Sequence, residues 1–187
     1  MSTKVEVKGV LNGVDVKAVE ELVRNLQDNP DLAKCNFRAR NKWLTGGHNQ
    51  TRISDFYGAQ QDINHKTTFV LDADEPPILA GEDRGANPVE HLLNALAACV
   101  TTTLVYHAAV RGIKIEELES ELDGDLDIRG FLGITNEVRR GYSNIRVKFK
   151  VKTDEENIEK LKALSKLSPV FDVTSNGTNV DITIERK

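Results

Sequence analysis

The feature that most limits the fold is a run of 20 residues, His91–Val110, that contains no aspartate, glutamate, lysine or arginine. A helix of this length is long enough to span a bilayer. Its threonines, its two histidines and Asn94 are unfavourable in a membrane interior, so we expect a buried helix and no membrane partner. Asn87-Pro88 predicts where this helix begins, because Asn caps free backbone amides and Pro suits the first helical position.

The two faces of this predicted helix differ in size rather than in charge. Leu92, Leu96 and Leu104 recur at helical spacing and keep one face apolar. Ala98 and Thr102 lie on the opposite face, which carries small residues. Such a helix is expected to be covered on most of its sides.

Composition and charge suit an ordinary globular chain. The 187 residues are 39% hydrophobic and 29% charged, which excludes a mainly disordered protein. The net charge of −4 provides no cationic field, so we expect no nucleic-acid partner. Ser2–Lys8 is polar and basic, unlike a signal peptide, and the cysteines are few, namely Cys35 and Cys99. The chain is therefore expected to be cytoplasmic.

The remaining pattern predicts a mixture of strands and helices. The N-terminal segment is predicted to form a strand at Val5–Val7, a turn at Asn12-Gly13 and a helix over residues 16–26. Alternating apolar residues predict further strands at 35–44, 52–57, 67–71, 118–128, 145–151 and 180–184. A second amphipathic helix is expected over Asp154–Leu167, with Thr153 as its cap.

The residues by themselves leave the role of Cys99 open. A free cysteine often packs as a small hydrophobe. A reactive thiol instead needs a nearby cation, hydrogen-bond donors or a helix N-terminus. Cys99 lies about three turns past Pro88, beyond the reach of the helix dipole, so any activation must come from another segment.

No metal or other cofactor is expected. The sequence has no Cys-x-x-Cys, no His-Glu-x-x-His, no calcium-loop pattern and no glycine-rich phosphate loop. His91 and His107 are roughly 24 Å apart on one helix, too far to share a metal within one chain. His48 and His65 fall in turn-like segments and are interpreted as surface residues.

The segment Asn87-Pro88-Val89-Glu90-His91-Leu92-Leu93-Asn94-Ala95-Leu96-Ala97-Ala98-Cys99 resembles the central-helix motif of the OsmC/Ohr family of thiol peroxidases and their relatives. Ser168-Pro169-Val170 falls where such proteins often carry Cys-Pro-Val, and Gly46-Gly47 through Arg52 is similar to the family's N-terminal hairpin. The resemblance covers residues 35–187. Residues 1–34 would then be a β-turn-α addition.

This resemblance implies an α+β fold, in which two long central helices pack against antiparallel sheets. It also implies an intertwined homodimer with active sites near the subunit boundary. Two chains could cover both faces of the uncharged helix more completely than one chain could.

The resemblance also implies a set of site residues. In active peroxidases of the family, a thiolate attacks the hydroperoxide while an arginine and a glutamate hold the thiolate. By this likeness Cys99 matches the attacking cysteine and Arg52 the arginine. The position of the family's glutamate is Val89, so the candidate acid is Glu90, one residue later.

The family's second cysteine, which resolves the sulfenic acid as a disulfide, is replaced by Ser168. Serine cannot form a disulfide. A sulfenic acid at Cys99 would therefore need an unidentified external thiol as reductant, or Cys35.

Three functions remain open at this point. The first is reduction of organic hydroperoxides through Cys99, as a defence against oxidative stress. The second is a non-catalytic dimer that binds a small apolar ligand at the subunit interface, and the third is a structural protein without a pocket. An approach of Arg52 or Arg84 to the Cys99 sulfur would favour peroxide reduction. A Cys99 thiol with neither water nor a cation beside it would exclude that function.

Overall fold

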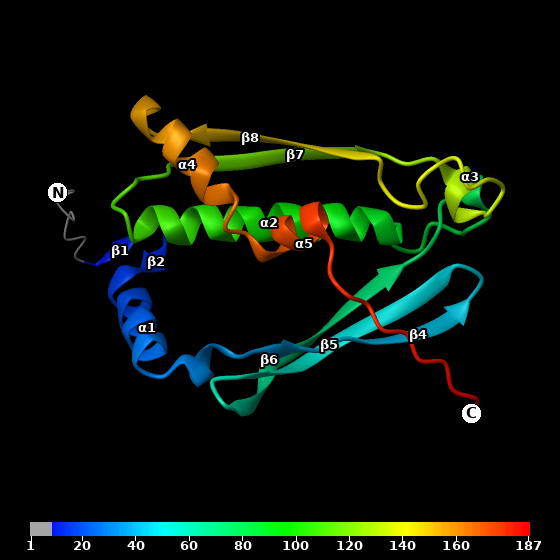
Figure 1. Ribbon diagram of the computed structural model, residues 1–187, viewed down its shortest axis with the longest axis horizontal. Coiled ribbons are helices and arrows are strands. Elements are labelled where there is room, and N and C mark those ends of the chain that lie inside the picture. Colours follow the sequence, from blue (N-terminus) through cyan, green and yellow to red (C-terminus); the bar gives the residue numbers. More distant parts are fainter. Residues whose placement is uncertain (1–8) are drawn as a thin grey trace. The chain divides into compact units, whose positions relative to one another are not determined.

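The computed structural model describes residues 9–187, and contacts divide the chain into two compact units (Figure 1). The sheet unit is Asp15–Leu92. The core-helix unit combines the described residues up to Val14 with Leu93–Lys187. The strand predicted at Val5–Val7 lies outside the described residues. The division into an addition over 1–34 and a domain over 35–187 stays a prediction.

The sheet unit is built around one long central strand. Its elements are α1 (Val16–Asp28), η1 (Pro30–Ala33), β3 (Asn36–Phe37), β4 (Arg40–Thr45), β5 (His48–Gly58), β6 (Gln61–Ala73) and η2 (Pro77–Leu79). Strand β5 pairs antiparallel with β3 and β4 along one edge and with β6 along the other. The predicted helix after the Asn12-Gly13 turn and the predicted strands at 52–57 and 67–71 are confirmed, although β5 and β6 are longer than expected. The strand predicted over 35–44 is divided into β3 and β4.

The turn between β4 and β5 depends on both of its glycines. Gly46 has a φ of 54°, in the left-handed region that favours glycine. A Cβ at Gly47 would lie 2.8 Å from Oδ1 of Asp74, too close for any other residue without a local shift. The turn predicted at Gly46-Gly47 is therefore confirmed, and it packs against the loop that follows β6.

An ion-pair network joins the strands of this sheet at Asp55, next to an irregularity in the β5–β6 register. Arg40 Nη1 donates to Asp55 Oδ1 at 2.5 Å, and Arg38 Nη1 donates to Oδ2 at 3.0 Å. Arg38 also reaches Asp62 Oδ1 at 2.7 Å. The hydrogen bonds from Arg40 and then from Arg38 lower the pKa of Asp55 to about 2.

This network predicts a specific acid sensitivity. An unfolded aspartate has a pKa of about 3.9. The lowered folded pKa of Asp55 therefore adds stability above about pH 4, which is lost as the pH falls through the folded value of about 2. We expect Asp55→Asn to lower the free energy of unfolding at pH 7, and the deficit relative to wild type to shrink between about pH 4 and pH 2.

Urea unfolding at a series of pH values measures this deficit. Asp62→Asn is the matched control, because Asp62 is exposed and makes one ion pair with Arg38. A deficit for Asp55→Asn that is independent of pH would contradict the assignment.

The core-helix unit is organised by α2 (Pro88–Ala109), whose first turn still belongs to the sheet unit. The other elements of this unit are β7 (Glu117–Asp125), α3 (Ile128–Phe131), β8 (Asn144–Lys152), η3 (Glu155–Asn157), α4 (Ile158–Ser165) and α5 (Pro169–Asn176). Leu96, Val100 and Leu104 of α2 form a buried cluster with Leu161 and Leu164 of α4. Inward-facing residues of β7 and β8 pack against this cluster. The two strands run alongside α2 in Figure 1.

Strands β7 and β8 form a hairpin with two chemically different faces. The inner face carries Leu118, Leu122, Val147 and Phe149, among others. On the outer face, acidic residues of β7 stand opposite basic residues of β8, as in the register pairs Glu117↔Lys152, Glu119↔Lys150, Glu121↔Lys148 and Asp123↔Arg146. The alternation of apolar and polar residues along the sequence predicted both strands. The opposite charges that face each other across the two strands add modest stability.

A short N-terminal hairpin, β1 (Val10–Leu11) and β2 (Val14–Asp15), is tied to the core-helix unit by Asn12. The Asn12 amide donates to the Ile113 carbonyl oxygen at 2.9 Å, and its oxygen accepts from the Ile115 N–H at 2.9 Å. Asn12 has a φ of 53° and Gly13 a φ of 77°, so the predicted Asn12-Gly13 turn is confirmed.

Three expectations for the C-terminal half were wrong in detail. The strand predicted over 118–128 ends at Asp125, and Asp127 instead caps α3 by accepting from the Arg129 N–H at 3.0 Å. Thr153 does not cap the following helix, because its hydroxyl donates to the Lys114 carbonyl oxygen at 2.6 Å. The helix predicted over Asp154–Leu167 is divided into η3 and α4.

The closing strand predicted at residues 180–184 is also absent from the part of the chain that the structure describes. Val180, Ile182 and Ile184 are instead exposed, the last to 92%. Alternation gives this segment the pattern of a strand, but within residues 9–187 no neighbouring strand pairs with it. A strand needs such a partner because its backbone hydrogen bonds lie between chains or segments.

The mixed helix-and-sheet class is confirmed. Among the described residues α2 is the long helix, with 22 residues, whereas α4 and α5 have eight each. By length and composition α2 could also cross a membrane. Core helices meet the same criteria, and Leu96, Val100 and Leu104 of α2 are packed in the cluster described above.

Candidate functional site

Cys99 lies in the middle of helix α2 and is half-buried. The hydroxyl of Thr103 donates to the Cys99 carbonyl oxygen at 2.8 Å, a bond within the helix that leaves the sulfur uninvolved. Ala95 lies one helical turn before Cys99 on the same face of α2, and Thr102 lies one turn after it. Both residues are exposed and uncharged. Cys99 is therefore partly exposed, on a helix face that carries no charge.

No described residue of the core-helix unit donates a hydrogen bond to the sulfur of Cys99. A thiol becomes a good nucleophile when a cation or donor stabilises its thiolate. The unit that contains Cys99 thus supplies the thiol but not the activating group. This agrees with the expectation that activation must come from another segment.

Arg52 lies on β5 in the sheet unit, where it is exposed and stands in register opposite Arg40 on β4 and Val70 on β6. Arg40 is neutralised by Asp55. Arg52 makes no ion pair or hydrogen bond through its side chain within the described residues 9–187. Its guanidinium is therefore free to receive an anion.

Arg84, the other arginine considered from the sequence, is placed differently. Its guanidinium forms an ion pair with Glu82 in the loop between β6 and α2. Of the two candidates, Arg52 is the one without an anionic neighbour in the described part of the chain.

Glu90, the candidate catalytic acid, caps the start of α2. Its Oε2 accepts from the Asn87 N–H at 2.9 Å, while Asn87 Oδ1 accepts from the Val89 N–H at 2.9 Å. These reciprocal bonds are a capping box. Glu90 forms no ion pair with Arg52 in the described part of the sheet unit, which contains both residues. The sequence Asn-Pro-Val-Glu carried this signal, since a capping residue is followed three positions later by Glu.

This assignment predicts how Glu90 tolerates substitution. Gln also serves at the third position of a capping box. We expect Glu90→Gln to keep the stability and any thiol reactivity of the protein, and Glu90→Ala to lose about 1 kcal/mol of stability. Thermal unfolding measures the stability of both variants, and the rate of thiol oxidation by a hydroperoxide measures their reactivity. Loss of reactivity in a fully stable Glu90→Gln variant would show that the carboxylate is needed for chemistry.

Ser168, at the position of the family's second cysteine, is fully buried with 0% exposure. Its Oγ accepts from the Phe171 N–H at 3.2 Å and caps α5, and Pro169 follows at the first helical position. The side chain thus has a structural role that serine performs well. Cys35, the other thiol, is exposed and lies in the sheet unit just before β3.

His48 and His91 have ordinary polar partners, whereas His65 packs against the rings of Phe56 and Phe69. His48 Nε2 lies 2.8 Å from Asp72 Oδ1, and His91 Nε2 lies 3.1 Å from the Asp72 carbonyl oxygen. The hydrogen bonds from His48 and then Gln50 lower the pKa of Asp72. Among residues 9–187 there is no group of three or more His, Cys, Asp or Glu side chains that could hold a metal ion.

Sequence reasoning missed a buried carboxylate, Asp74, which is 2% exposed at the end of the sheet unit's last strand. Burial would raise its pKa, but backbone N–H groups of Glu75, Arg84 and Glu82 donate to it and together lower the pKa. Asp74 thereby holds the loop that leads to α2. No sequence pattern identified it, because its partners are backbone amides up to ten residues away.

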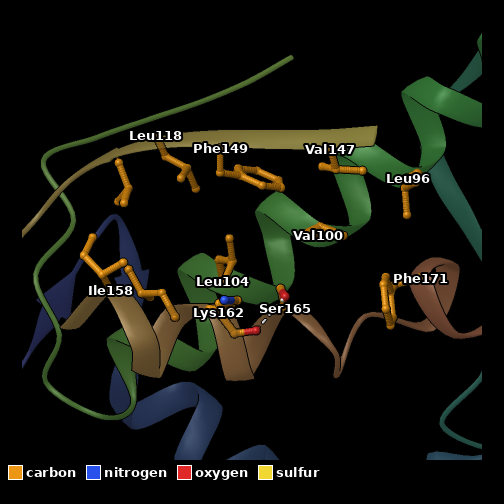
Figure 2. A pocket seen from close by; sticks show the side chains of 12 residues that line it. Leu96, Val100, Leu104, Leu118, Val147, Phe149, Ile158, Lys162, Ser165 and Phe171 are labelled. Carbon is orange, nitrogen blue, oxygen red and sulfur yellow. Dashed lines mark hydrogen bonds between the residues drawn. The ribbon is translucent and has the colours of Figure 1, made fainter. Parts of the chain in front are cut away.

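Sequence reasoning also missed an apolar cavity of about 400 Å³ inside the core-helix unit (Figure 2). The expected apolar site was at a subunit interface, whereas this cavity is lined by elements of one unit and is partly open to solvent. Figure 2 shows Leu118, Phe149 and Val147 on the strand side, with Lys162 and Ser165 on the helix α4 side.

Comparison with known proteins supports a family assignment. A family model described as OsmC-like protein matches residues 81–183. No curated protein matches the chain.

Several solved structures share the fold. An OsmC-like protein from Mycoplasma pneumoniae has a TM-score of 0.57 at 18% identity, covering 75% of this chain and 88% of its own. An OsmC-like protein from Vibrio cholerae has a TM-score of 0.56 at 11% identity, with coverage of 73% and 92%. A Legionella pneumophila protein described as an organic hydroperoxide resistance protein has a TM-score of 0.52 at 17% identity, with coverage of 75% and 91%.

Proposed function

Since this chain belongs to the OsmC-like protein family, we propose that it reduces organic hydroperoxides, with Cys99 as the attacking thiol. The observation that carries the proposal is the position of Cys99, which is half-buried on an uncharged face of α2 within the matched residues. A relative of the same fold is described as an organic hydroperoxide resistance protein. The apolar surroundings of Cys99 favour fatty or aromatic hydroperoxides over hydrogen peroxide.

The reaction balances with an external thiol as the reductant. The Cys99 thiolate attacks the terminal oxygen of the hydroperoxide, the O–O bond breaks, and the leaving alkoxide takes a proton to become an alcohol. The product on the protein is a sulfenic acid. One reductant thiol displaces water to give a mixed disulfide, and a second thiol releases Cys99 and leaves as the oxidised reductant.

An external reductant is needed because the usual internal one is missing. Ser168 replaces the family's second cysteine and is buried as the cap of α5. Cys35 remains as the chain's other thiol. Arg52 is proposed as the group that orients the Cys99 thiolate, supported by its free guanidinium. A cytoplasmic location stays a prediction.

We expect wild-type protein to be oxidised by cumene hydroperoxide faster than an ordinary free thiol. Cys99→Ser should abolish this reaction and Cys35→Ser should leave it largely intact. Arg52→Met should slow it on the order of 100-fold, because a positioned cation would be lost. Arg84→Met is the control, since Arg84 is already paired with Glu82.

Stopped-flow measurement of thiol loss gives these rates. A wild-type rate equal to that of a free thiol, or one unchanged by Cys99→Ser, would overturn the proposal.

The proposal includes a homodimer, supported by two uncovered surfaces. Leu92, Ala98, Thr102 and Tyr106 are exposed on one face of α2 although none is charged. The segment Val180–Ile184 has the alternation of a strand but exposes its apolar side chains. A second copy of the chain would cover the first surface, and an edge strand of that copy would pair with the second.

This proposal predicts that the protein has twice the 20.8 kDa mass of one chain in solution. Ile182→Lys should shift the protein toward monomer, because it places a charge on the apolar side of the proposed strand. Asp181→Lys is the matched control on the opposite side of the strand and should leave the dimer intact. Light scattering coupled to size exclusion measures the mass. A monomeric wild-type protein, or equal effects of the two variants, would contradict the dimer.

A further inference from the structure

The cavity of about 400 Å³ in the core-helix unit has no role in the proposed thiol chemistry. Leu96, Val100 and Leu104 form its α2 wall at a spacing of four residues. Cys99 precedes Val100 and is turned about 100° from it on a regular helix. Cys99 is not among the lining residues, so this cavity is separate from the thiol.

Two polar side chains interrupt the apolar lining, and both come from α4. The Ser165 hydroxyl donates to the Lys162 carbonyl oxygen at 2.8 Å and keeps its capacity to accept. The Lys162 ammonium makes no hydrogen bond or ion pair within the described residues. Its neighbour Lys160, by contrast, pairs with Glu156 and donates to Asn157. The cavity therefore combines apolar walls with one exposed lysine at its edge whose ammonium has no anionic partner in the described chain.

Size and charge together define a ligand class. A group the size of a water molecule occupies about 30 Å³, so the cavity holds roughly a dozen such groups. The cavity is open to solvent at the side of Val147, which is 40% exposed, so a ligand can enter it. The dimensions suit a hydrocarbon chain of about ten carbons, and an anionic group at one end would neutralise Lys162.

We propose that this cavity binds a linear aliphatic carboxylate of medium length. The hydrocarbon chain lies between α2 and the inner face of β7 and β8, and the carboxylate lies at Lys162 and Ser165 (Figure 2). This binding site goes beyond the proposed peroxidase function and does not depend on it. Cys99→Ser protein is therefore expected to bind the same ligand with unchanged affinity.

Calorimetric titration of the full-length protein with decanoate and with 1-decanol tests the proposal. Both probes should bind, with decanoate the tighter. Lys162→Met keeps the aliphatic stem but loses the charge, so decanoate should bind about five- to tenfold more weakly and decanol about as before. Lys166→Met, one turn further along and outside the lining, is the matched control and should change neither affinity.

A second variant tests the cavity itself without removing a buried residue. Val147 is 40% exposed at the cavity wall, so Val147→Phe should fill the space while the protein stays folded, and both probes should lose binding. Circular dichroism confirms folding. The proposal is overturned if neither probe binds wild-type protein saturably, or if Lys162→Met and Lys166→Met weaken decanoate equally.

Discussion

The structure depends on the need to cover helix α2, which carries no aspartate, glutamate, lysine or arginine after its first turn. The helix has almost no polar face with which to meet water, which favours burial of its apolar side chains. Leu96, Val100 and Leu104 are packed against α4 and against the inner faces of β7 and β8. The face with Ala98 and Thr102 remains exposed. The same helix therefore explains both the core of its unit and the surface on which the proposed dimer rests.

The β7–β8 hairpin can cover α2 because its two faces are chemically distinct. One face supplies apolar side chains to the core, and the other presents paired opposite charges to water. A two-stranded hairpin is marginal by itself, and packing against a helix provides the missing stability. This packing leaves space between the hairpin, α2 and α4, and that space is the cavity with Lys162 at its edge.

The candidate catalytic residues fall into two groups. Cys99 and Arg52 have no structural partner through their side chains among the described residues, which leaves them available for chemistry. Glu90 and Ser168 are instead occupied in helix caps at the starts of α2 and α5. Both caps can be derived from the sequence, as Asn-Pro-Val-Glu and Ser-Pro, because capping acts over three or four residues.

The sequence by itself determined what depends on near neighbours. Its periodicity predicted most of the helices and strands, its Asn-Gly and Gly-Gly pairs predicted the turns at Asn12-Gly13 and Gly46-Gly47, and Asn87-Pro88 predicted the start of α2. Its motif pointed to the family and to Cys99. Only the tertiary structure decided that residues 180–184 have no strand partner within the described chain, that Asp74 anchors a loop, and that a cavity opens beside Lys162. These features depend on contacts between distant segments, which a local pattern of side chains does not specify.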